Sequence, residues 1–298
     1  MNAEHQKAFF AIRILMAVIA FTLGLGLASE DFRRVARQRR AVAVGMTAQT
    51  LLVPALGFVV AKVFGLSAEL AVGLVLLCAC PGGIHSNYYN KLARGDVALS
   101  MTLTSVSTLV NMATLPLVVF LATKVFTGDG EVVTMSARDA VGELAFLIVV
   151  PLAIGVALRA RNGERAAKVE RAMMFVSGGL LLLLVFGAVA KNGGLMLAHA
   201  RAVGLPVIVL QVAAMGSSYA FASIAGLPES QRITVALEGG IQNATLAVAL
   251  AYALSPEPSV AIPAIVYSVA IYFTAAAFIP IGRRRVPAEP ADEALSRT

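Results

Sequence analysis

Long apolar stretches separated by short charged segments make up most of this chain. Seven stretches of 18 to 27 residues contain no Asp, Glu, Lys or Arg: 41–61, 70–90, 97–123, 172–190, 202–228, 239–256 and 258–282. Two shorter stretches, 14–29 and 144–158, approach the same length if Arg13 and Glu143 lie near the membrane interface. Because a helix needs about 20 apolar residues to cross a bilayer, the pattern predicts nine membrane-spanning helices.

The composition supports this interpretation. Hydrophobic residues make up 58% of the chain and charged residues 14%, whereas about a quarter of the residues in soluble domains are charged. The chain has two cysteines, which excludes a disulfide-rich secreted scaffold. The connections between the predicted spans are too short to hold a soluble domain. We therefore expect residues 1–298 to form a single all-α transmembrane domain that ends in a polar tail, 283–298.

The basic residues indicate how the spans are oriented. The 24 Lys and Arg residues exceed the 17 Asp and Glu residues, which gives a net charge of +7. With the N-terminus outside and the C-terminus in the cytoplasm, 17 basic residues fall on the cytoplasmic side and seven outside, as the positive-inside rule requires. The cytoplasmic ones cluster at 33–40, 91–94, 159–171 and 283–297. Topology explains this charge, so we expect a lipid bilayer as the partner and no nucleic acid.

The third and eighth predicted spans share a sequence pattern. Each begins with a Gly-Leu turn, at 65–66 and 226–227, and reaches a Gly-Gly-Ile sequence, at 82–84 and 239–241, with Asn within the next three residues. The charge distribution gives these two spans opposite orientations. Paired, interrupted helices in inverted repeats are typical of secondary transporters. The pattern predicts two broken helices, although the turn and the break are 17 residues apart in one span and 13 in the other.

Glu238 lies inside a predicted span, six residues after Arg232 and 19 before Glu257. An ionised side chain there costs roughly 2.5 to 3.5 kcal/mol or more. The neighbouring apolar stretches contain no Arg or Lys, so the expected partner is a bound cation or a proton. The structural alternative is a protonated Glu238 that forms a hydrogen bond between helices.

Side chains with oxygen atoms recur on other spans and gather near the two predicted breaks. They are Gln49, Ser86, Asn87, Ser100, Thr104, Gln242 and Asn243. Ser100 and Thr104 are four residues apart and therefore share one helix face. A single Ser or Thr in a membrane helix usually bonds to nearby backbone, but the cluster as a whole suits a hard monovalent cation.

Two groups of motifs give the chain a resemblance to a known family. The first runs through 80–87 (Cys-Pro-Gly-Gly-x-x-Ser-Asn), 92–100 (Leu-Ala-Arg-Gly-Asp-Val-Ala-Leu-Ser) and 104–109 (Thr-x-x-Ser-Thr-Leu). The second covers 238–247 (Glu-x-Gly-x-Gln-Asn-x-x-Leu-Ala). With Gln49 and Pro54 included, the chain resembles the bile acid:sodium symporter family over essentially its whole length.

The resemblance implies an architecture. The family has two inverted five-helix repeats that form a core and a panel domain, with two broken helices that cross near the middle of the membrane. This chain would be a nine-span bacterial member, located in the inner membrane, that lacks the first helix. Its first repeat would cover about 9–125 and its second about 135–282.

The resemblance also implies ligand sites for two coupling sodium ions and no other cofactor. The first sodium site would use Ser86, Asn87, Ser100, Thr104 and Glu238. The second would use Gln49, Glu238 and Gln242 with the backbone near Gly239 and Ile241. Asn243 is the expected substrate contact. Ile84, His85 and Tyr272 lie at presumed substrate positions and depart from the family pattern.

The leading hypothesis is therefore sodium-coupled symport of a small organic anion by alternating access, with no enzymatic activity and no obligate protein partner. Proton-coupled or uncoupled anion transport is an alternative, as is a ligand-binding membrane sensor that does not transport. A membrane enzyme that uses His85, Asp96 and Glu238 is disfavoured, because Asp96 falls in a predicted cytoplasmic turn and no nucleophile or metal-ligand motif accompanies His85.

Overall fold

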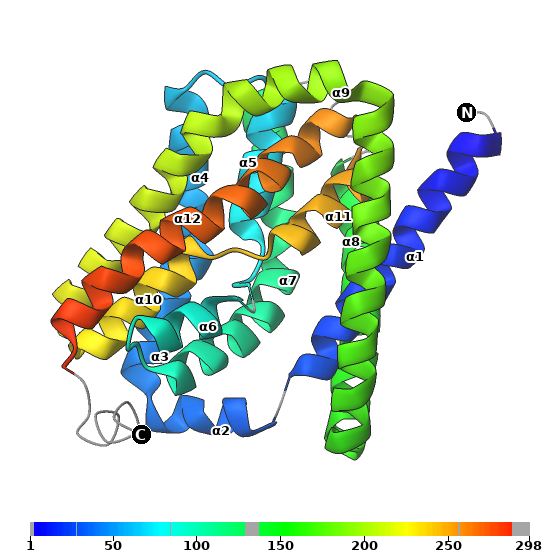
Figure 1. The fold of residues 1–298 in the computed structure, drawn as a ribbon. Helices are drawn as coiled ribbons and strands as arrows, with labels where there is room; N and C mark the ends of the chain where they lie inside the picture. The colour runs from blue at the N-terminus through cyan, green and yellow to red at the C-terminus, as the bar shows by residue number, and fades with distance from the viewer. Residues whose placement is uncertain (1–2, 28, 84, 129–136, 256, 288–298) are drawn as a thin grey trace, which may run out of the picture.

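The computed structural model describes residues 3–27, 29–83, 85–128, 137–255 and 257–287. The described residues form helices joined by short turns (Figure 1), which agrees with the predicted all-α class. The helices are α1 (Ala3–Gly26), α2 (Ser29–Arg37), α3 (Arg39–Thr47), α4 (Val53–Val63), α5 (Ala68–Ala79), α6 (His85–Leu92), α7 (Val97–Thr127), α8 (Ala137–Arg161), α9 (Gly163–Ile224), α10 (Glu229–Gly240), α11 (Ala244–Leu254) and α12 (Ile262–Arg285). A π-helical segment, Ala48–Leu52, joins α3 to α4, and a 3₁₀ turn, Pro258–Ala261, leads into α12.

Several of these helices have the length and composition of membrane spans. Within the described residues, four continuous helical segments qualify: Arg39–Val63, Val97–Thr127, Leu197–Ile224 and Pro258–Arg285. Three shorter apolar helices, Arg13–Gly26, Ala68–Ala79 and Ala244–Leu254, accompany them. The last two are short because a break interrupts the apolar stretch to which each belongs. The protein is therefore a helical, multi-pass membrane protein.

The connection between the first two predicted spans contains the helix α2. Phe32 and Val35, three residues apart on one face, pack against the buried core, while Arg33 and Arg37 are exposed. An amphipathic segment of this kind is stabilised as a helix by the burial of its apolar face. In Figure 1 α2 lies across the lower end of the molecule and links α1 to α3.

The spans expected at 172–190 and 202–228 belong to one continuous helix, α9, of 62 residues. At 1.5 Å per residue such a helix is about 90 Å long, three times the hydrocarbon thickness of about 30 Å. Figure 1 shows how it fits: α9 rises on the right, bends at the top and returns diagonally. The two predicted spans are joined without an interruption of the helix, since 191–201 contains no proline that would remove a helical hydrogen bond.

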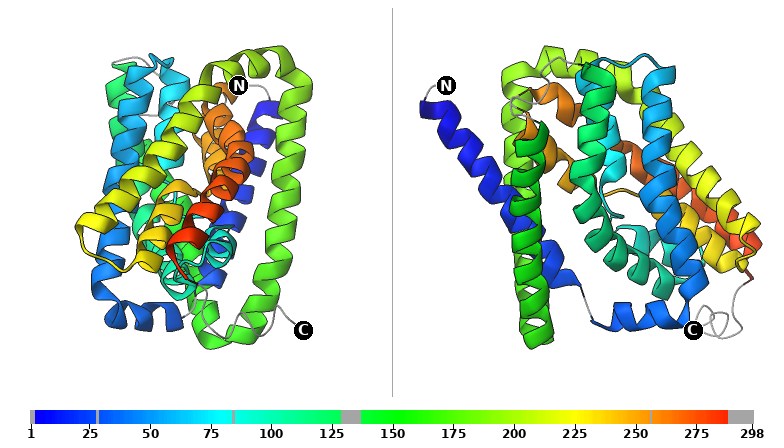
Figure 2. Two further views of the ribbon diagram at one scale, coloured as in Figure 1. Left: turned by 60° about the vertical axis from the view of Figure 1, so that its left-hand side comes forward. Right: turned by 180° about the vertical axis from the view of Figure 1, so that it is seen from behind.

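The helices α1 and α8 cross (Figure 2). At their contact Gly24 of α1 faces Gly155 of α8. A Cβ atom on Gly155 would lie 2.4 Å from the carbonyl oxygen of Phe21 and 2.9 Å from the Cα atom of Gly24. Small residues at a crossing let two membrane helices approach closely. Together with the first part of α9, these helices form a group beside the remaining helices in Figures 1 and 2.

The turns before α5 and α10 have the same backbone structure. Gly65 and Gly226 have φ angles of 59° and 66°, a region that favours glycine. In both turns the next residue donates a backbone hydrogen bond of 3.1 Å across the helix end, from Leu66 to Ala61 and from Leu227 to Ala222. The Gly-Leu pairs recognised in the sequence are therefore matching helix C-caps.

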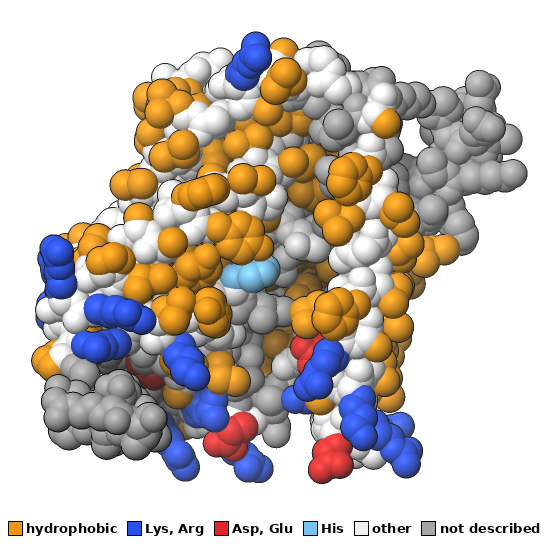
Figure 3. Space-filling view, viewed as in Figure 1, with side chains coloured by type: hydrophobic (Ala, Val, Ile, Leu, Met, Phe, Trp, Pro, Cys, Tyr) orange, Lys and Arg blue, Asp and Glu red, His pale blue; other side chains and the backbone are white. Residues whose placement is uncertain are grey.

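Charged and apolar side chains occupy different parts of the surface. Lys and Arg side chains gather toward the lower end of the face in Figure 3, while hydrophobic side chains cover most of the face above them. At this lower end α2 crosses, α6 turns into α7 and α12 ends in Arg283, Arg284 and Arg285 (Figure 1). The same view is hollowed between the column formed by α9 and the rest of the molecule, most openly at the lower end.

Candidate functional site: a buried carboxylate where two helix breaks cross

Two helix breaks, between α5 and α6 and between α10 and α11, meet inside the protein. The backbone N–H of Gly83 donates to the carbonyl of Ile241, and the N–H of Asn243 donates to the carbonyl of Pro81, both at 2.9 Å. Gly82 and Gln242 face each other in an isolated antiparallel β-bridge. Backbone groups freed at membrane depth need partners within the protein, and here each break supplies partners for the other. The second break follows Gly240, within the Gly-Gly-Ile sequence at 239–241.

Two side chains from neighbouring helices hold this crossing. The hydroxyl of Tyr267, on α12, donates to the carbonyl of Gly240 at 2.6 Å and accepts from the N–H of Gln242 at 3.2 Å. Asn111, on α7, donates to the carbonyl of Cys80 at 3.2 Å. Both residues are 1% exposed, so water does not compete for these hydrogen bonds. The crossing is a buried, hydrogen-bonded unit.

Glu238 lies at the end of α10, with 2% of its surface exposed. Its Oε1 accepts a 2.5 Å hydrogen bond from Ser100 Oγ, and its Oε2 accepts one of 3.1 Å from Thr104 Oγ1. A Cβ atom on Gly82 would stand 2.7 Å from Glu238 Oε2, so the carboxylate reaches the first break. The ion pairs found among the described residues do not include Glu238.

Further oxygen-bearing side chains belong to the start of α6. Ser86 lies within hydrogen-bonding reach of the Glu238 carboxylate, and the next residue, Asn87, has a buried Oδ1 atom without a hydrogen-bond partner among the described residues. A buried polar atom left unpaired costs about 1 to 3 kcal/mol. Oxygen is the ligand that hard cations prefer. The structure thus brings Ser86, Ser100, Thr104 and Glu238 together, next to Asn87, in a set of atoms that fits a sodium ion.

A second polar group lies at the other side of the crossing. Gln49 Nε2 donates to Gln242 Oε1 at 2.7 Å, and Gln242 Nε2 donates to the carbonyl of Gly239 at 3.0 Å. Gln49 Oε1 is buried and has no partner among the described residues. Gln49 belongs to the π-helical segment, a distortion common at functional sites. The structure brings Gln49, Gly239 and Gln242 together, whereas the carbonyl of Ile241 is already used by Gly83.

Sequence reasoning missed three residues that support this site: Asn90, Asn111 and Tyr267. Asn90, fully buried on α6, donates from Nδ2 to Ser100 Oγ and to the carbonyl of Ser86, both at 3.0 Å. Asn90 and Asn111 carried a usable signal, because each is an amide side chain within a predicted span. Tyr267 carried no such signal, since tyrosines are common in membrane helices and its contacts are tertiary.

The residues expected to contact substrate fall into three cases. Ile84 lies outside the described residues. Asn243 caps α11, because its Oδ1 accepts a 3.0 Å hydrogen bond from the N–H of Leu246. His85, the first residue of α6, and Tyr272, on α12, are both exposed and pack edge to face with ring centroids 5.8 Å apart. The side chains of Cys78 and Cys80 are buried in the apolar core.

Comparison with known proteins places the chain in a family. A family model described as the sodium bile acid symporter family matches residues 13–199, more than half of the chain. The chain belongs to this family. The resemblance predicted from the motifs at 80–109 and 238–247 is therefore confirmed.

Individual relatives share about 30% of their residues with this chain. A probable sodium/metabolite cotransporter of chloroplasts, BASS2 from Oryza sativa subsp. japonica, is 30% identical over 93% of this chain and 65% of its own length. The ileal sodium/bile acid cotransporter of Cricetulus griseus is 29% identical over 83% of this chain and 70% of its own length. The sodium-dependent transporter YocS of Bacillus subtilis is 29% identical over 87% of this chain and 78% of its own length.

Proposed function

We propose that this protein is a sodium-coupled symporter that moves a small organic anion across the membrane by alternating access. The observation that carries the proposal is the carboxylate of Glu238, buried at the crossing of two helix breaks and surrounded by oxygen atoms. Its described partners are hydroxyl groups, and the buried oxygens of Asn87 and Gln49 have no hydrogen-bond partner among the described residues. The names of the relatives, all sodium-dependent transporters or cotransporters, agree with this interpretation.

Two sodium ions bind in the proposed mechanism. The first is held by Glu238 with the oxygens of Ser86, Asn87, Ser100 and Thr104. The second is held by Gln49 Oε1, Gln242 Oε1 and Glu238 with backbone carbonyls at Gly239 and Ile241. The unpaired buried oxygens support both positions, because a cation supplies the partner that each oxygen lacks.

The charge of this site accounts for the class of substrate. Two sodium ions facing one carboxylate leave a net positive charge, which attracts an anion. Symport of two sodium ions with a monoanion moves one net charge, so the membrane potential contributes about 2.3 kcal/mol per 100 mV. Asn243, which follows the second break, together with His85 and Tyr272 beside the first, is our choice for the substrate contacts.

The proposed architecture has nine spans in two inverted repeats, at about 9–125 and 135–282. The identical turns at Gly65 and Gly226 and the antiparallel pairing of the two breaks support the repeats. In this arrangement α1, α8 and the first part of α9 form a panel that moves against a core containing the crossing. The close contact of Gly24 with Gly155 suits a panel that moves as a unit.

We place the protein in a bacterial inner membrane with its N-terminus outside and its C-terminus in the cytoplasm. The helix α1 begins at the upper end in Figure 1 and α12 finishes at the lower end, where basic side chains gather. Basic residues are retained on the cytoplasmic side. An odd number of spans is consistent with ends on opposite sides.

The proposal is tested with sodium itself as the first probe. The purified protein is heated in detergent with sodium chloride or potassium chloride at equal ionic strength, each with and without taurocholate, pyruvate or benzoate. Sodium is expected to raise the unfolding temperature, because a ligand that binds only the folded state stabilises it. One of the anions is expected to add to this stabilisation only when sodium is present, because the two sites are coupled.

Transport is then measured as uptake of ²²Na⁺ into proteoliposomes with the stabilising anion present. The expected result is uptake that depends on the anion. Equal stabilisation by sodium and potassium would contradict the sodium sites. Anion uptake that depends on pH and not on sodium would indicate proton coupling, and saturable binding without any flux would indicate a sensor.

A further inference from the structure

The first turn of α6 carries an exposed aromatic surface beside the candidate cation site. His85 and Tyr88 are three residues apart and therefore share a helix face, and Tyr88 is 64% exposed. Tyr272 of α12 packs edge to face against His85, at 5.8 Å between ring centroids and 79° between planes. We call His85, Tyr88 and Tyr272 the aromatic wall.

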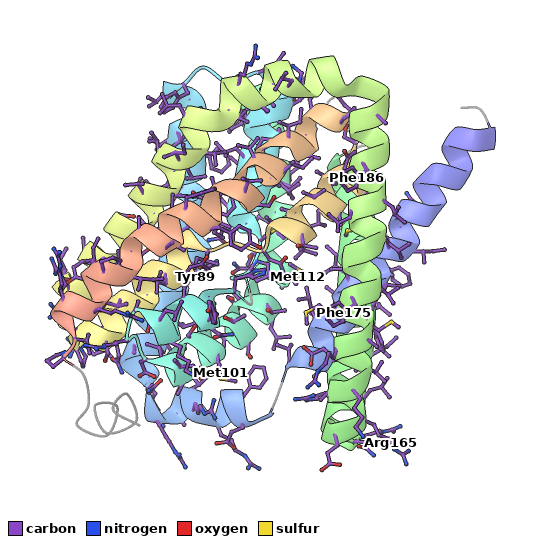
Figure 4. All side chains as sticks on the ribbon, viewed as in Figure 1. Tyr89, Met101, Met112, Arg165, Phe175 and Phe186 are labelled. Carbon is purple, nitrogen blue, oxygen red and sulfur yellow. The ribbon has the colours of Figure 1, made fainter. Side chains whose placement is uncertain are left out.

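The aromatic wall is held in place by Tyr89. In Figure 4 Tyr89 lies between α6 and α12. Its hydroxyl donates to the carbonyl of Tyr272 at 3.4 Å, and its ring packs edge to face on that of Tyr88 at 6.0 Å. Tyr89 is 9% exposed, so it anchors the wall from the buried side. The exposed rings are consequently fixed relative to each other and to α12.

The wall lies next to the crossing rather than on a remote surface. His85 directly precedes Ser86, which neighbours the Glu238 carboxylate. The hydroxyl of Tyr267 donates a hydrogen bond to the crossing itself. Tyr272 lies five residues further along α12, which corresponds to a rise of about 7.5 Å along the helix axis. An imidazole and two phenol groups in this position provide polar edges together with flat apolar faces. Such a surface differs from the aliphatic side chains that cover most lipid-facing helices.

We propose that the aromatic wall selects a substrate in which the carboxylate is attached to a flat, unsaturated ring. This inference rests on the proposed function, because the sodium sites supply the attraction for the carboxylate. The ring then packs edge to face or in an offset stack against His85 and Tyr272, an arrangement that a puckered, saturated ring does not reproduce. Tyr88, on the same face, covers a second side of the ring.

A matched pair of ligands tests the proposal. Benzoate and cyclohexanecarboxylate have the same charge and carbon count and differ in the unsaturation of the ring. Their dissociation constants are measured by thermal shift in sodium chloride with the full-length wild-type protein. Benzoate is expected to bind roughly three- to tenfold more tightly, the range that an aromatic pair contributes.

Two variants locate the effect. In Tyr272→Leu the ratio of the two dissociation constants is expected to fall toward one, while the stabilisation by sodium alone is unchanged. Phe273→Leu is the control, because Phe273 is the adjacent aromatic residue on α12, is 73% exposed and is not part of the wall. In this variant the ratio is expected to stay at the wild-type value.

The outcomes separate this inference from the proposed function. Equal or tighter binding of cyclohexanecarboxylate to the wild-type protein overturns the inference, as does an equal change of the ratio in the two variants. Sodium stabilisation without binding of either acid overturns the inference and leaves the sodium sites intact. Absence of any specific stabilisation by sodium contradicts the proposed function itself. The wild-type ratio decides the question even if Tyr272→Leu does not fold.

Discussion

Gly95 lies directly against the side chain of Asn90, so that a Cβ atom on residue 95 would stand 2.3 Å from Asn90 Oδ1. The same atom would lie 2.8 Å from Thr234 Oγ1. Asn90 in turn bonds to Ser100 Oγ, which donates to the Glu238 carboxylate. The turn between α6 and α7 is therefore connected to the candidate cation site through a single side chain.

We predict that Gly95→Ala weakens sodium binding although residue 95 is not a proposed ligand. The added methyl group forces Asn90 to move, and both of its hydrogen bonds of 3.0 Å, to the carbonyl of Ser86 and to Ser100 Oγ, are then disturbed. We expect the sodium concentration at half-saturation to rise about tenfold, equivalent to the loss of about 1.4 kcal/mol. Thermal shift against sodium concentration measures this change.

Gly178→Ala is the control for that substitution. Gly178 is on α9, and a Cβ atom there would meet no atom within 4 Å outside its own helix. Its sodium dependence is expected to match the wild type, with equal or higher stability because alanine favours a helix. An unchanged sodium dependence in Gly95→Ala would show that Asn90 does not position Ser100.

Glu238→Gln is expected to abolish both stabilisation by sodium and sodium-driven uptake, because the amide carries no negative charge for either ion. The hydroxyls of Ser100 and Thr104 retain an acceptor, so the folded state is expected to persist without sodium. Glu229→Gln is the matched control: it removes a charge from the other end of α10, where Glu229 pairs with Arg232 at 3.2 Å. A Glu238→Gln protein with full sodium-dependent uptake would contradict both proposed sites.

Gln49→Ala is expected to weaken sodium dependence without abolishing transport. The substitution removes the donor to Gln242 Oε1 and the unpaired Oε1 atom of Gln49, which belong to the second proposed site alone. We expect half-saturation by sodium to rise about tenfold and the Hill coefficient to fall toward one. Gln231→Ala, in the first turn of α10, serves as the control, and an equal loss in both variants would argue against a specific second site.

Two Tyr→Phe substitutions test the hydrogen bonds at the crossing. Tyr267→Phe removes a hydroxyl that contacts Gly240 and Gln242 at the second break, and we expect a loss of roughly 1 to 3 kcal/mol in unfolding free energy. Tyr252→Phe removes a buried hydroxyl that has no hydrogen-bond partner among the described residues, so we expect stability to be unchanged or higher. Denaturation of both variants in the same detergent is the measurement, and equal losses would contradict the role given to Tyr267.

The length of the apolar stretches and the distribution of charge were sufficient to predict the membrane class, because both are properties of the chain itself. The first helix break was also predictable, since Pro81 lacks a backbone N–H and interrupts helical hydrogen bonding. The second was predictable from its likeness to the first, as a Gly-Gly-Ile sequence followed by Asn. The family followed from the motifs around these breaks.

The tertiary structure decided what meets at the breaks. Ser100 and Glu238 are 138 residues apart, and their 2.5 Å contact depends on how α7 packs against α10. Glu238 was conspicuous in the sequence because a charge in an apolar span is costly. The contributions of Asn90, Tyr267 and Gly95 emerged only from the fold, because each acts through a neighbour that the sequence places elsewhere.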